Sequence, residues 1–278
     1  MKYLNDLMFW VGERERMRLR RSEGHPSPWT TDPILHHYRF CNVDRCHDRV
    51  TQWVHNNWLR PNDGLPSLPF AMAVARMVNL PETLADLGYP YIWDNLRFIE
   101  VLARRKLAGK KVWTSAYMIT GGYSEGGESK EVIIARVLTT LYNQLLMTPV
   151  KQGDTLDEAA TKLRAPGIGT FLSAQIIADL KYSQILETAK DWDWWCAPGP
   201  GSTLGLNFLH ERPELTTLAG PQFLREVNEV KTLLGHAGVH LDAQNVQNCL
   251  CEFSKYVRAK HFGKRLKSGF IPYEAMKQ

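Results

Sequence analysis

The spacing of apolar residues predicts helices along most of the chain. In the clearest segment, Trp93, Leu96, Ile99 and Leu102 recur at near-helical intervals. Sustained alternation of apolar and polar residues, the signature of a half-buried strand, is almost absent. The pattern predicts helices over the opening stretch to residue 21 and over residues 43–60, 70–78, 93–107, 131–146, 156–163, 171–182, 223–234 and 246–260. We therefore expect an all-α bundle of many short helices.

Proline and glycine mark the expected breaks between these helices. A Pro/Ser/Thr-rich break covers residues 22–33, a glycine-rich loop covers 121–129, and the Trp/Pro/Gly-rich segment 187–207 is predicted to be irregular. Arg14, Arg18 and Arg21 share one face of the opening helix, which we expect to be solvated. We expect three parts: a basic helix and linker at 1–30, a helical domain at 31–262 with a hairpin at 156–182, and a basic tail at 263–278.

Composition narrows the class of protein. The formal net charge of +5 permits a nucleic-acid partner without requiring one. Five cysteines without a CxxC pair argue against a disulfide framework and an ordinary zinc finger. The apolar run near the N-terminus is too short for a signal peptide, and no run reaches the length of a membrane span. We expect a reduced, cytoplasmic monomer without a metal or cofactor and without membrane contact.

The turn Pro166-Gly167-Ile168-Gly169 joins two apolar helices. Glycine permits a tight turn and a close approach of phosphate, and the amides that begin the second helix can point at an anion. Lys162 and Arg164 flank the turn, and Thr170 opens the second helix. A plain helix–helix turn is the alternative, but the helices on both sides match a DNA-gripping hairpin. Such a hairpin holds the DNA backbone and carries no sequence information.

Three further segments carry candidate chemistry. The segment YRFCNVDRCHDRVTQW (38–53) is dense in polar residues, which a capped helix with a solvated face would also explain. In DWDWWCAPGPGSTLGLN (191–207), tryptophans around two carboxylates could stack a flipped base, although at least one is expected in the core. In NVQNCLCEFSKYVRAK (245–260), Glu252 and Lys255 are spaced as a helical pair, a spacing usually found in surface ion pairs.

These motifs resemble a known superfamily and, within it, a narrower family. The hairpin resembles that of the helix-hairpin-helix DNA glycosylases, in which an essential aspartate follows the hairpin by about twenty residues. Asp191 and Asp193 both fit that spacing, and Phe171 stands where bifunctional members carry a lyase lysine. The order of RFxNVxRxxDRVTxW, GPGSxxGLN and CEFxKY over residues 30 to 260 is similar to the phage α-glutamyl/putrescinyl-thymine pyrophosphorylase family. That family overlaps the helical domain of hydroxymethyluracil DNA kinases.

The resemblance implies a reaction on modified thymine in phage DNA. A separate kinase converts 5-hydroxymethyluracil in the DNA to a pyrophosphate ester, and the glycosylase-like enzyme replaces that pyrophosphate with an amine. The expected partners are double-stranded DNA bearing the modified thymine and an amino acid, such as glycine, or a polyamine, within the cytoplasm of an infected bacterium. The reaction requires a flipped base, a group that accepts the proton of the amine, and cations for the leaving pyrophosphate.

The candidate residues divide by role. Asp191 or Asp193 is the catalytic candidate, acting as a base or stabilising positive charge. DNA binding is assigned to Lys162, Arg164, Gly167, Gly169 and Thr170. Arginine suits the pyrophosphate best, so Arg39, Arg45 and Arg49 come first and Lys130 second, and Tyr117 either orients the base or fills the core. The remaining candidates for the substrate site are Asn42, Asp48, Trp192, Trp194, Gly199, Gly201, Ser202, Asn207, Glu252 and Lys255.

Two other functions fit the same residues. A DNA glycosylase would excise a modified base and leave an abasic site, with Asp191 supporting attack by water. A non-catalytic DNA-binding module would use the hairpin alone. The glycine-rich GGYSEGGES lacks the GxxxxGK[ST] spacing of a phosphate-binding loop, so the sequence does not indicate a kinase.

Overall fold

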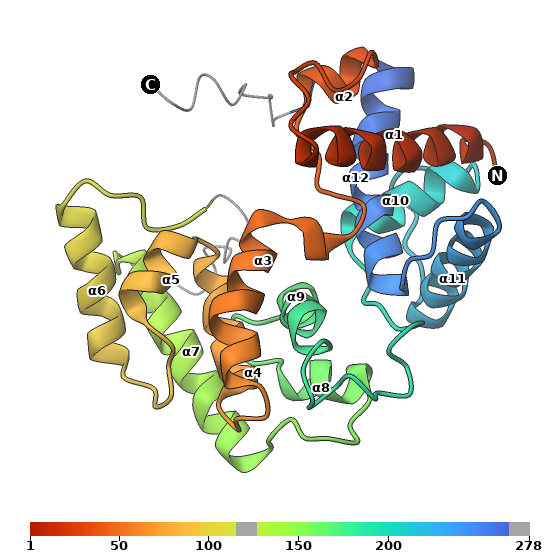
Figure 1. Ribbon diagram of the computed structural model, residues 1–278. Helices are drawn as coiled ribbons and strands as arrows, with labels where there is room; N and C mark the ends of the chain where they lie inside the picture. Colours follow the sequence, from red (N-terminus) through yellow and green to blue (C-terminus); the bar gives the residue numbers. More distant parts are fainter. Residues whose placement is uncertain (115–126, 267–278) are drawn as a thin grey trace. The chain divides into compact units, whose positions relative to one another are not determined.

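The computed structural model describes residues 1–114 and 127–266, and over these residues the chain is helical without a β-strand (Figure 1). The all-α prediction, with many short helices, is confirmed. Tyr117 and the end of the basic tail lie outside the described residues. No described helix combines the length and the apolar character that crossing a membrane requires.

The chain divides into two compact units. A continuous unit runs from Arg49 to Trp195, and a discontinuous unit joins Met1–Asp48 to Cys196–Gln278. The segment 38–53, expected to act as one motif, is therefore shared between the units. Each unit has its own helices.

The continuous unit is built around one fully buried helix, α4. Every residue of α4 is buried, and α4 packs against α5, α7 and α9. Asn79 ends α4 in a left-handed conformation, and Pro81 then begins α5. The helices of this unit are α3 (Arg49–Val54), the π-helix η2 (His55–Leu59), the 3-10 helix η3 (Arg60–Asn62), α4 (Leu68–Val78), α5 (Pro81–Leu87), α6 (Asn95–Leu107), α7 (Lys130–Met147), α8 (Leu156–Lys162) and α9 (Thr170–Leu180).

The discontinuous unit packs its first and last helices together. Trp10 of α1 and Phe253 and Tyr256 of α12 belong to its buried core. Its helices are α1 (Leu4–Ser22), α2 (Pro33–His37), the 3-10 helix η1 (Arg45–His47), α10 (Pro200–Leu209), α11 (Gly220–His236) and α12 (Ala243–Phe262).

The expectation of a solvated arginine face on α1 is wrong at Arg14. This side chain is buried, and its guanidinium donates to the carbonyl oxygens of Phe40 at 3.0 Å and Cys41 at 3.2 Å. Arg18 pairs with Glu15. Arg14 is buried because its fork of donors satisfies two carbonyls of the segment that follows α2.

The prediction of an irregular segment over 187–207 is wrong from Pro200 onward, where α10 forms. Pro200 occupies the first turn of α10, where a missing N–H is harmless. The glycines that favour a loop in isolation bring α10 close to α12. A Cβ on Gly201 would overlap Cys251, and one on Gly205 would overlap the carbonyl of Leu250. Tertiary packing therefore overrides low helix propensity.

Candidate functional site

The hairpin of the continuous unit consists of α8, a tight turn and α9. Thr155 and Glu158 form a capping box at the start of α8. Ala165 and Ile168 exchange backbone hydrogen bonds of 3.2 and 2.7 Å across the turn. Gly167 adopts a φ of +91°, and a Cβ there would lie 2.6 Å from a methyl group of Val137, so both conformation and space require glycine.

The start of α9 is open to solvent. Gly169 is its N-cap, it is exposed, and an added Cβ would meet nothing within 4 Å. Phe171 in the first turn is 46% exposed. A helix start leaves its first amides without helical acceptors, so these amides can bind an anion that approaches along the open side of Gly169.

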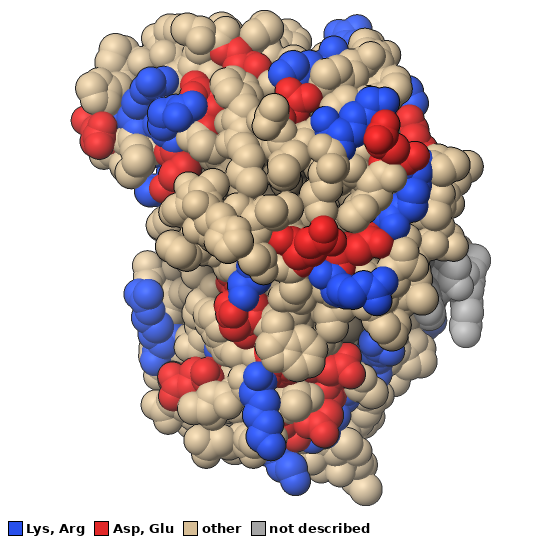
Figure 2. Space-filling model, turned by 90° about the vertical axis from the view of Figure 1, so that its right-hand side faces the viewer, with Lys and Arg blue, Asp and Glu red and all other residues tan. Residues whose placement is uncertain are grey.

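The two cations that flank the turn differ. The Lys162 ammonium donates to both carboxylate oxygens of Asp154, at 2.7 and 2.8 Å, and to the carbonyl of Pro149. Arg164 is exposed, and its carbonyl accepts from Gln144 of α7. Lys162 therefore fastens the loop before α8, whereas the charge of Arg164 is open to solvent. On the face shown in Figure 2, basic and acidic side chains are interspersed, and the described residues there form no continuous basic surface.

A buried ionic network holds α9 against the rest of the continuous unit. Asp179 of α9 is fully buried and accepts two hydrogen bonds from Arg76 of α4 and one of 3.2 Å from His55 of η2. Arg76 also donates to Thr51 at 3.0 Å and to Asn79 at 3.3 Å. Burial alone would raise the pKa of Asp179, but Arg76 and His55 outweigh it and hold that pKa well below the usual value for aspartate.

The two candidate aspartates that follow the hairpin occupy different environments. Asp191 is 2% exposed, and its two carboxylate oxygens accept the amides of Leu156 at 2.7 Å and Asp157 at 3.1 Å. It thereby caps the start of α8 from a distant part of the chain. Asp193 is exposed, and the neighbouring Trp194 is 47% exposed.

All three tryptophans of this segment donate a hydrogen bond from the indole nitrogen, and Trp194 donates to the carbonyl of Lys190 at 3.3 Å. Trp192 donates to the carbonyl of Lys181 at 2.8 Å, and Trp195 donates to the carboxylate of Asp157 at 2.9 Å. The ammonium of Lys181 lies 3.9 Å from the centre of the Trp192 ring. Trp192 and Trp195 therefore contribute to packing, and Trp194 presents the most accessible ring of the three.

In the discontinuous unit, the polar segment 39–48 lies against α12. The amide of Cys41 donates to Glu252 at 3.2 Å, and the amide of Arg45 donates to Asn245 at 3.1 Å. Within the segment, the amide of Asn42 donates to Asp48 at 3.3 Å. Two motifs that lie two hundred residues apart in the sequence are therefore brought together.

Glu252 is the centre of this contact. It is buried, and the ammonium of Lys255 donates to it at 2.5 Å. Burial acts to lower the pKa of Lys255, but the adjacent Glu252 carboxylate outweighs it and raises that pKa. The Glu252–Lys255 pair is thus partly buried, and Glu252 also accepts a hydrogen bond from the amide of Cys41. Its spacing alone indicates a surface pair.

The polar residues of the GPGSxxGLN motif form internal hydrogen bonds. Ser202 is fully buried; its hydroxyl donates to the carbonyl of Gly199 at 3.0 Å and accepts from Gln247 at 2.9 Å. Asn207 is also fully buried and donates to the carbonyls of Glu214 and Thr216. The polar residues of the GPGSxxGLN motif therefore hold α10 in place within the discontinuous unit.

The remaining candidates are scattered over the described chain. Arg39 is exposed in the discontinuous unit, where Arg45 is buried, and Arg49 is exposed at the start of α3 in the continuous unit. The ammonium of Lys130, at the start of α7, lies 4.7 Å from the centre of the Trp113 ring, and burial lowers its pKa. Among the described residues, no group of three or more His, Cys, Asp or Glu side chains is placed to hold a metal ion.

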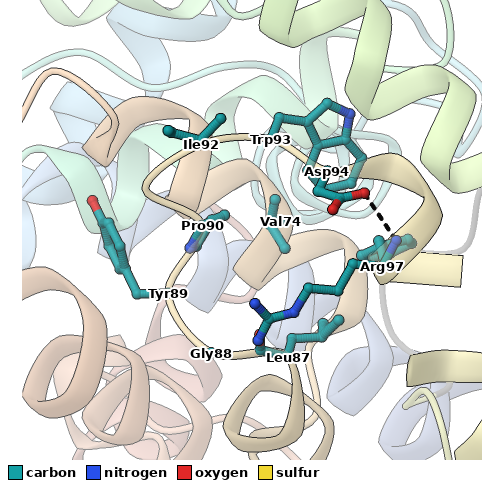
Figure 3. Close-up of a pocket in the computed structure, with 10 residues that line it drawn as sticks. Val74, Leu87, Gly88, Tyr89, Pro90, Ile92, Trp93, Asp94 and Arg97 are labelled. Atoms are coloured by element: carbon teal, nitrogen blue, oxygen red, sulfur yellow. Dashed lines mark hydrogen bonds between the residues drawn. The ribbon is translucent and has the colours of Figure 1, made fainter. Parts of the chain in front are cut away.

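The continuous unit also contains a cavity that the sequence did not predict. It has a volume of about 290 Å³ and is formed by the segment from Leu87 to Phe98 together with Val74 of α4 (Figure 3). The run LGYPYIWD, rich in aromatic residues, was the available signal.

Comparison with known proteins gives one family and one curated relative. A family model described as "5-hmdU DNA kinase, helical domain" matches residues 1–265. A protein named 5-hmdU DNA kinase, from Bacillus phage SP10, is 23% identical over an alignment 278 positions long, which covers 88% of this chain and 43% of that protein. The chain thus spans less than half the length of this relative. No solved structure matches.

Proposed function

The chain belongs to the family of the 5-hmdU DNA kinase helical domain, and from that premise we propose that it modifies 5-hydroxymethyluracil in phage DNA by amine transfer. The substrate is the pyrophosphate ester of the base, and the second substrate is an amino acid, such as glycine, or a polyamine. The observation that carries the DNA-binding part of the proposal is the exposed start of α9 at Gly169.

The reaction balances as a substitution at the methylene carbon of the base. The amine nitrogen forms a bond to that carbon while the bond from the carbon to the pyrophosphate oxygen breaks. Pyrophosphate leaves with the electron pair, and the amine gives up one proton to a base. We assign that base to Asp193, because it is exposed, and a positioning role to Asp191, whose oxygens accept two amides of α8.

Arginines are the proposed ligands of the leaving pyrophosphate, since their forked donors match its oxygens. Arg49, which belongs to the continuous unit together with Asp193, is exposed and can reach a substrate in solution, whereas Arg45 is buried. Trp194, half exposed beside Asp193, is the proposed stacking surface for a flipped base.

The deciding experiment incubates the full chain with duplex DNA that contains the pyrophosphorylated base and with candidate amines, followed by mass spectrometry of the nucleosides. An amine adduct with release of pyrophosphate supports transfer. Free base together with alkali-labile sites overturns transfer in favour of a glycosylase. Unchanged DNA that is nevertheless bound by the protein overturns it in favour of a binding module.

Matched variants then test the assigned residues. Asp193→Asn is expected to abolish transfer without weakening DNA binding, whereas Asp191→Asn is expected to lower stability. Arg49→Gln is compared with Arg60→Gln, which alters another exposed arginine of the same helical stretch. Equal transfer by the Arg49 and Arg60 variants would remove Arg49 from the proposed site.

A further inference from the structure

We infer that the cavity formed by Leu87 to Phe98 binds a free α-amino acid in its zwitterionic form. Its volume of about 290 Å³ is just below the range of small-molecule sites, which is about 300–1,000 Å³. The cavity belongs wholly to the continuous unit. The inference deepens the proposed function by giving a ligand of the second substrate's class a site of its own, and its role as amine donor rests on that function.

The apolar wall of the cavity is held in place before any ligand arrives. Trp93 donates its indole N–H to Thr139 at 2.8 Å, and its ring packs edgewise at 5.1 Å from the ring of Phe70. Val74, Pro90 and Phe98 complete this side of the cavity. Because this apolar wall is already ordered, it loses little conformational entropy when a ligand binds. It suits an aliphatic or aromatic side chain of the ligand.

Two opposite charges line the same cavity without pairing with each other. Asp94 uses one carboxylate oxygen to accept the amide of Arg97 at 3.0 Å, and Arg97 uses one guanidinium nitrogen to donate to the carbonyl of Leu87 at 3.3 Å. Figure 3 shows the guanidinium turned back toward Leu87 and Gly88, away from the Asp94 carboxylate. Over the described residues, no ion pair joins these two side chains, and both residues are exposed.

This arrangement complements a ligand that carries both charges at a short separation. The guanidinium can donate two parallel hydrogen bonds to a carboxylate, and the second oxygen of Asp94 can accept from an ammonium. The side chain of the ligand then faces Val74, Trp93 and Phe98. An amine without the carboxylate, or an acid without the ammonium, satisfies only one of the two charges.

Calorimetry on the full chain tests the site without DNA. The probes are leucine, its amine analogue isopentylamine and its acid analogue 4-methylpentanoate. Leucine is expected to bind about tenfold or more tightly than either analogue, because each analogue loses a charge-assisted hydrogen bond. Failure of leucine, glycine and phenylalanine to bind, or equal binding of leucine and an analogue, would overturn the inference.

Variants with matched controls locate the site. Asp94→Asn removes the charge but keeps a side chain that caps α6 well. Arg97→Gln removes the guanidinium. Both are expected to weaken leucine binding by about tenfold or more, while Glu100→Gln and Arg104→Gln, on exposed positions of α6 outside the cavity, leave it unchanged. Unchanged binding in the first two variants, with helix content intact by circular dichroism, would contradict the assignment.

Only the identification of this ligand as the amine donor rests on the proposed function. Amino acid binding without transfer to DNA would defeat the proposed function and leave the site standing. Transfer of an amino acid that is unaffected by Asp94→Asn and Arg97→Gln would defeat the role of the site in transfer and leave the proposed function standing.

Discussion

Two helix pairs of this molecule use glycine in opposite ways. In the discontinuous unit, Gly201 and Gly205 of α10 face α12, and an added Cβ would overlap Cys251 or the backbone of Leu250. In the continuous unit, Gly169 begins α9 beside open space. The two sequences, GPGS and PGIGT, look alike. Glycine spacing alone therefore does not separate a packing contact from a ligand site; the neighbours of each glycine do.

The two pairs are also held by different forces. The α10–α12 contact is a close approach of backbones with apolar neighbours. The hairpin is held to the rest of its unit by the buried ionic network of Asp179, Arg76 and His55. Charge therefore anchors α9 near its C-terminal end, and the variants below test this contrast.

Removing Arg76 is expected to have the largest effect. Arg76→Met leaves Asp179 buried without its main partner, which costs about 3–5 kcal/mol of unfolding free energy. Chemical denaturation measures the loss, and hydrogen exchange is expected to localise it to α9. The double variant Arg76→Met/Asp179→Leu removes both charges and is expected to recover most of the stability. A single variant as stable as the wild type would contradict the ionic support.

Acid is expected to weaken the same network. Because folding lowers the pKa of Asp179, its contribution is fully present above the ordinary aspartate pKa of about 3.9 and is lost as the pH falls toward the lowered value. Thermal melts of the wild type and of the double variant at pH 7, 5, 4 and 3 measure this, since other carboxylates titrate in both. As the pH falls, the wild type is expected to lose more stability than the double variant. A stability difference that stays constant with pH would contradict this contribution of Asp179.

Overpacking the α10–α12 contact is expected to have the next largest effect on stability. Gly205→Ala pushes a methyl group into the carbonyl of Leu250, and backbone cannot yield as a flexible side chain can. We expect a loss of about 3 kcal/mol, with faster hydrogen exchange in α10 and α12 and little change in α8 and α9. Gly220→Ala, at a glycine with open space, is the control. Equal losses of stability in Gly205→Ala and Gly220→Ala would contradict a close approach of backbones between α10 and α12.

Gly167→Ala is expected to cost about 2 kcal/mol, because it adds a strained left-handed residue to an overlap with Val137. Val137→Ala in the same chain relieves the overlap and leaves the strain. The double variant should therefore recover only part of the hairpin's stability in denaturation experiments. Full recovery would show that conformation does not require glycine at this turn.

Gly169→Ala is expected to have the smallest effect on stability, less than about 1 kcal/mol, because its φ of −82° is ordinary and its surroundings are open. Its effect on DNA binding should be larger, since a methyl group would stand where a phosphate approaches. Fluorescence anisotropy with duplex DNA at two salt concentrations measures this. Unchanged affinity would argue that the open glycine does not mark the DNA contact.

Much of the fold follows from local pattern. The apolar spacing of α6 and α12 is visible in the sequence, and the structure confirms these helices. The helix α10 was missed because its glycines and Pro200 favour a loop until α12 supplies the packing. The π-helix η2, which brings His55 to Asp179, has no distinct sequence signature.

The candidate sites were less predictable, because their partners are distant in the chain. Spacing could not show that Glu252 accepts the amide of Cys41, or that Asp191 caps α8. Nor could it show that Asp94 and Arg97 line one cavity while remaining unpaired, since their spacing on a helix usually indicates an ion pair. Such contacts depend on how helices pack, which residue periodicity does not encode.

The discontinuous unit has a consequence for synthesis on the ribosome. Its first segment, Met1–Asp48, packs against α12, which is translated some two hundred residues later. In the sequence, the continuous unit stands between this segment and α12, and it can fold as soon as it has left the ribosome. Until α12 follows, the apolar face of α1 lacks its partner helix, although Trp10 can already contact Phe40. During translation, the core shared by this first segment and α12 can therefore form only after α12 has been made.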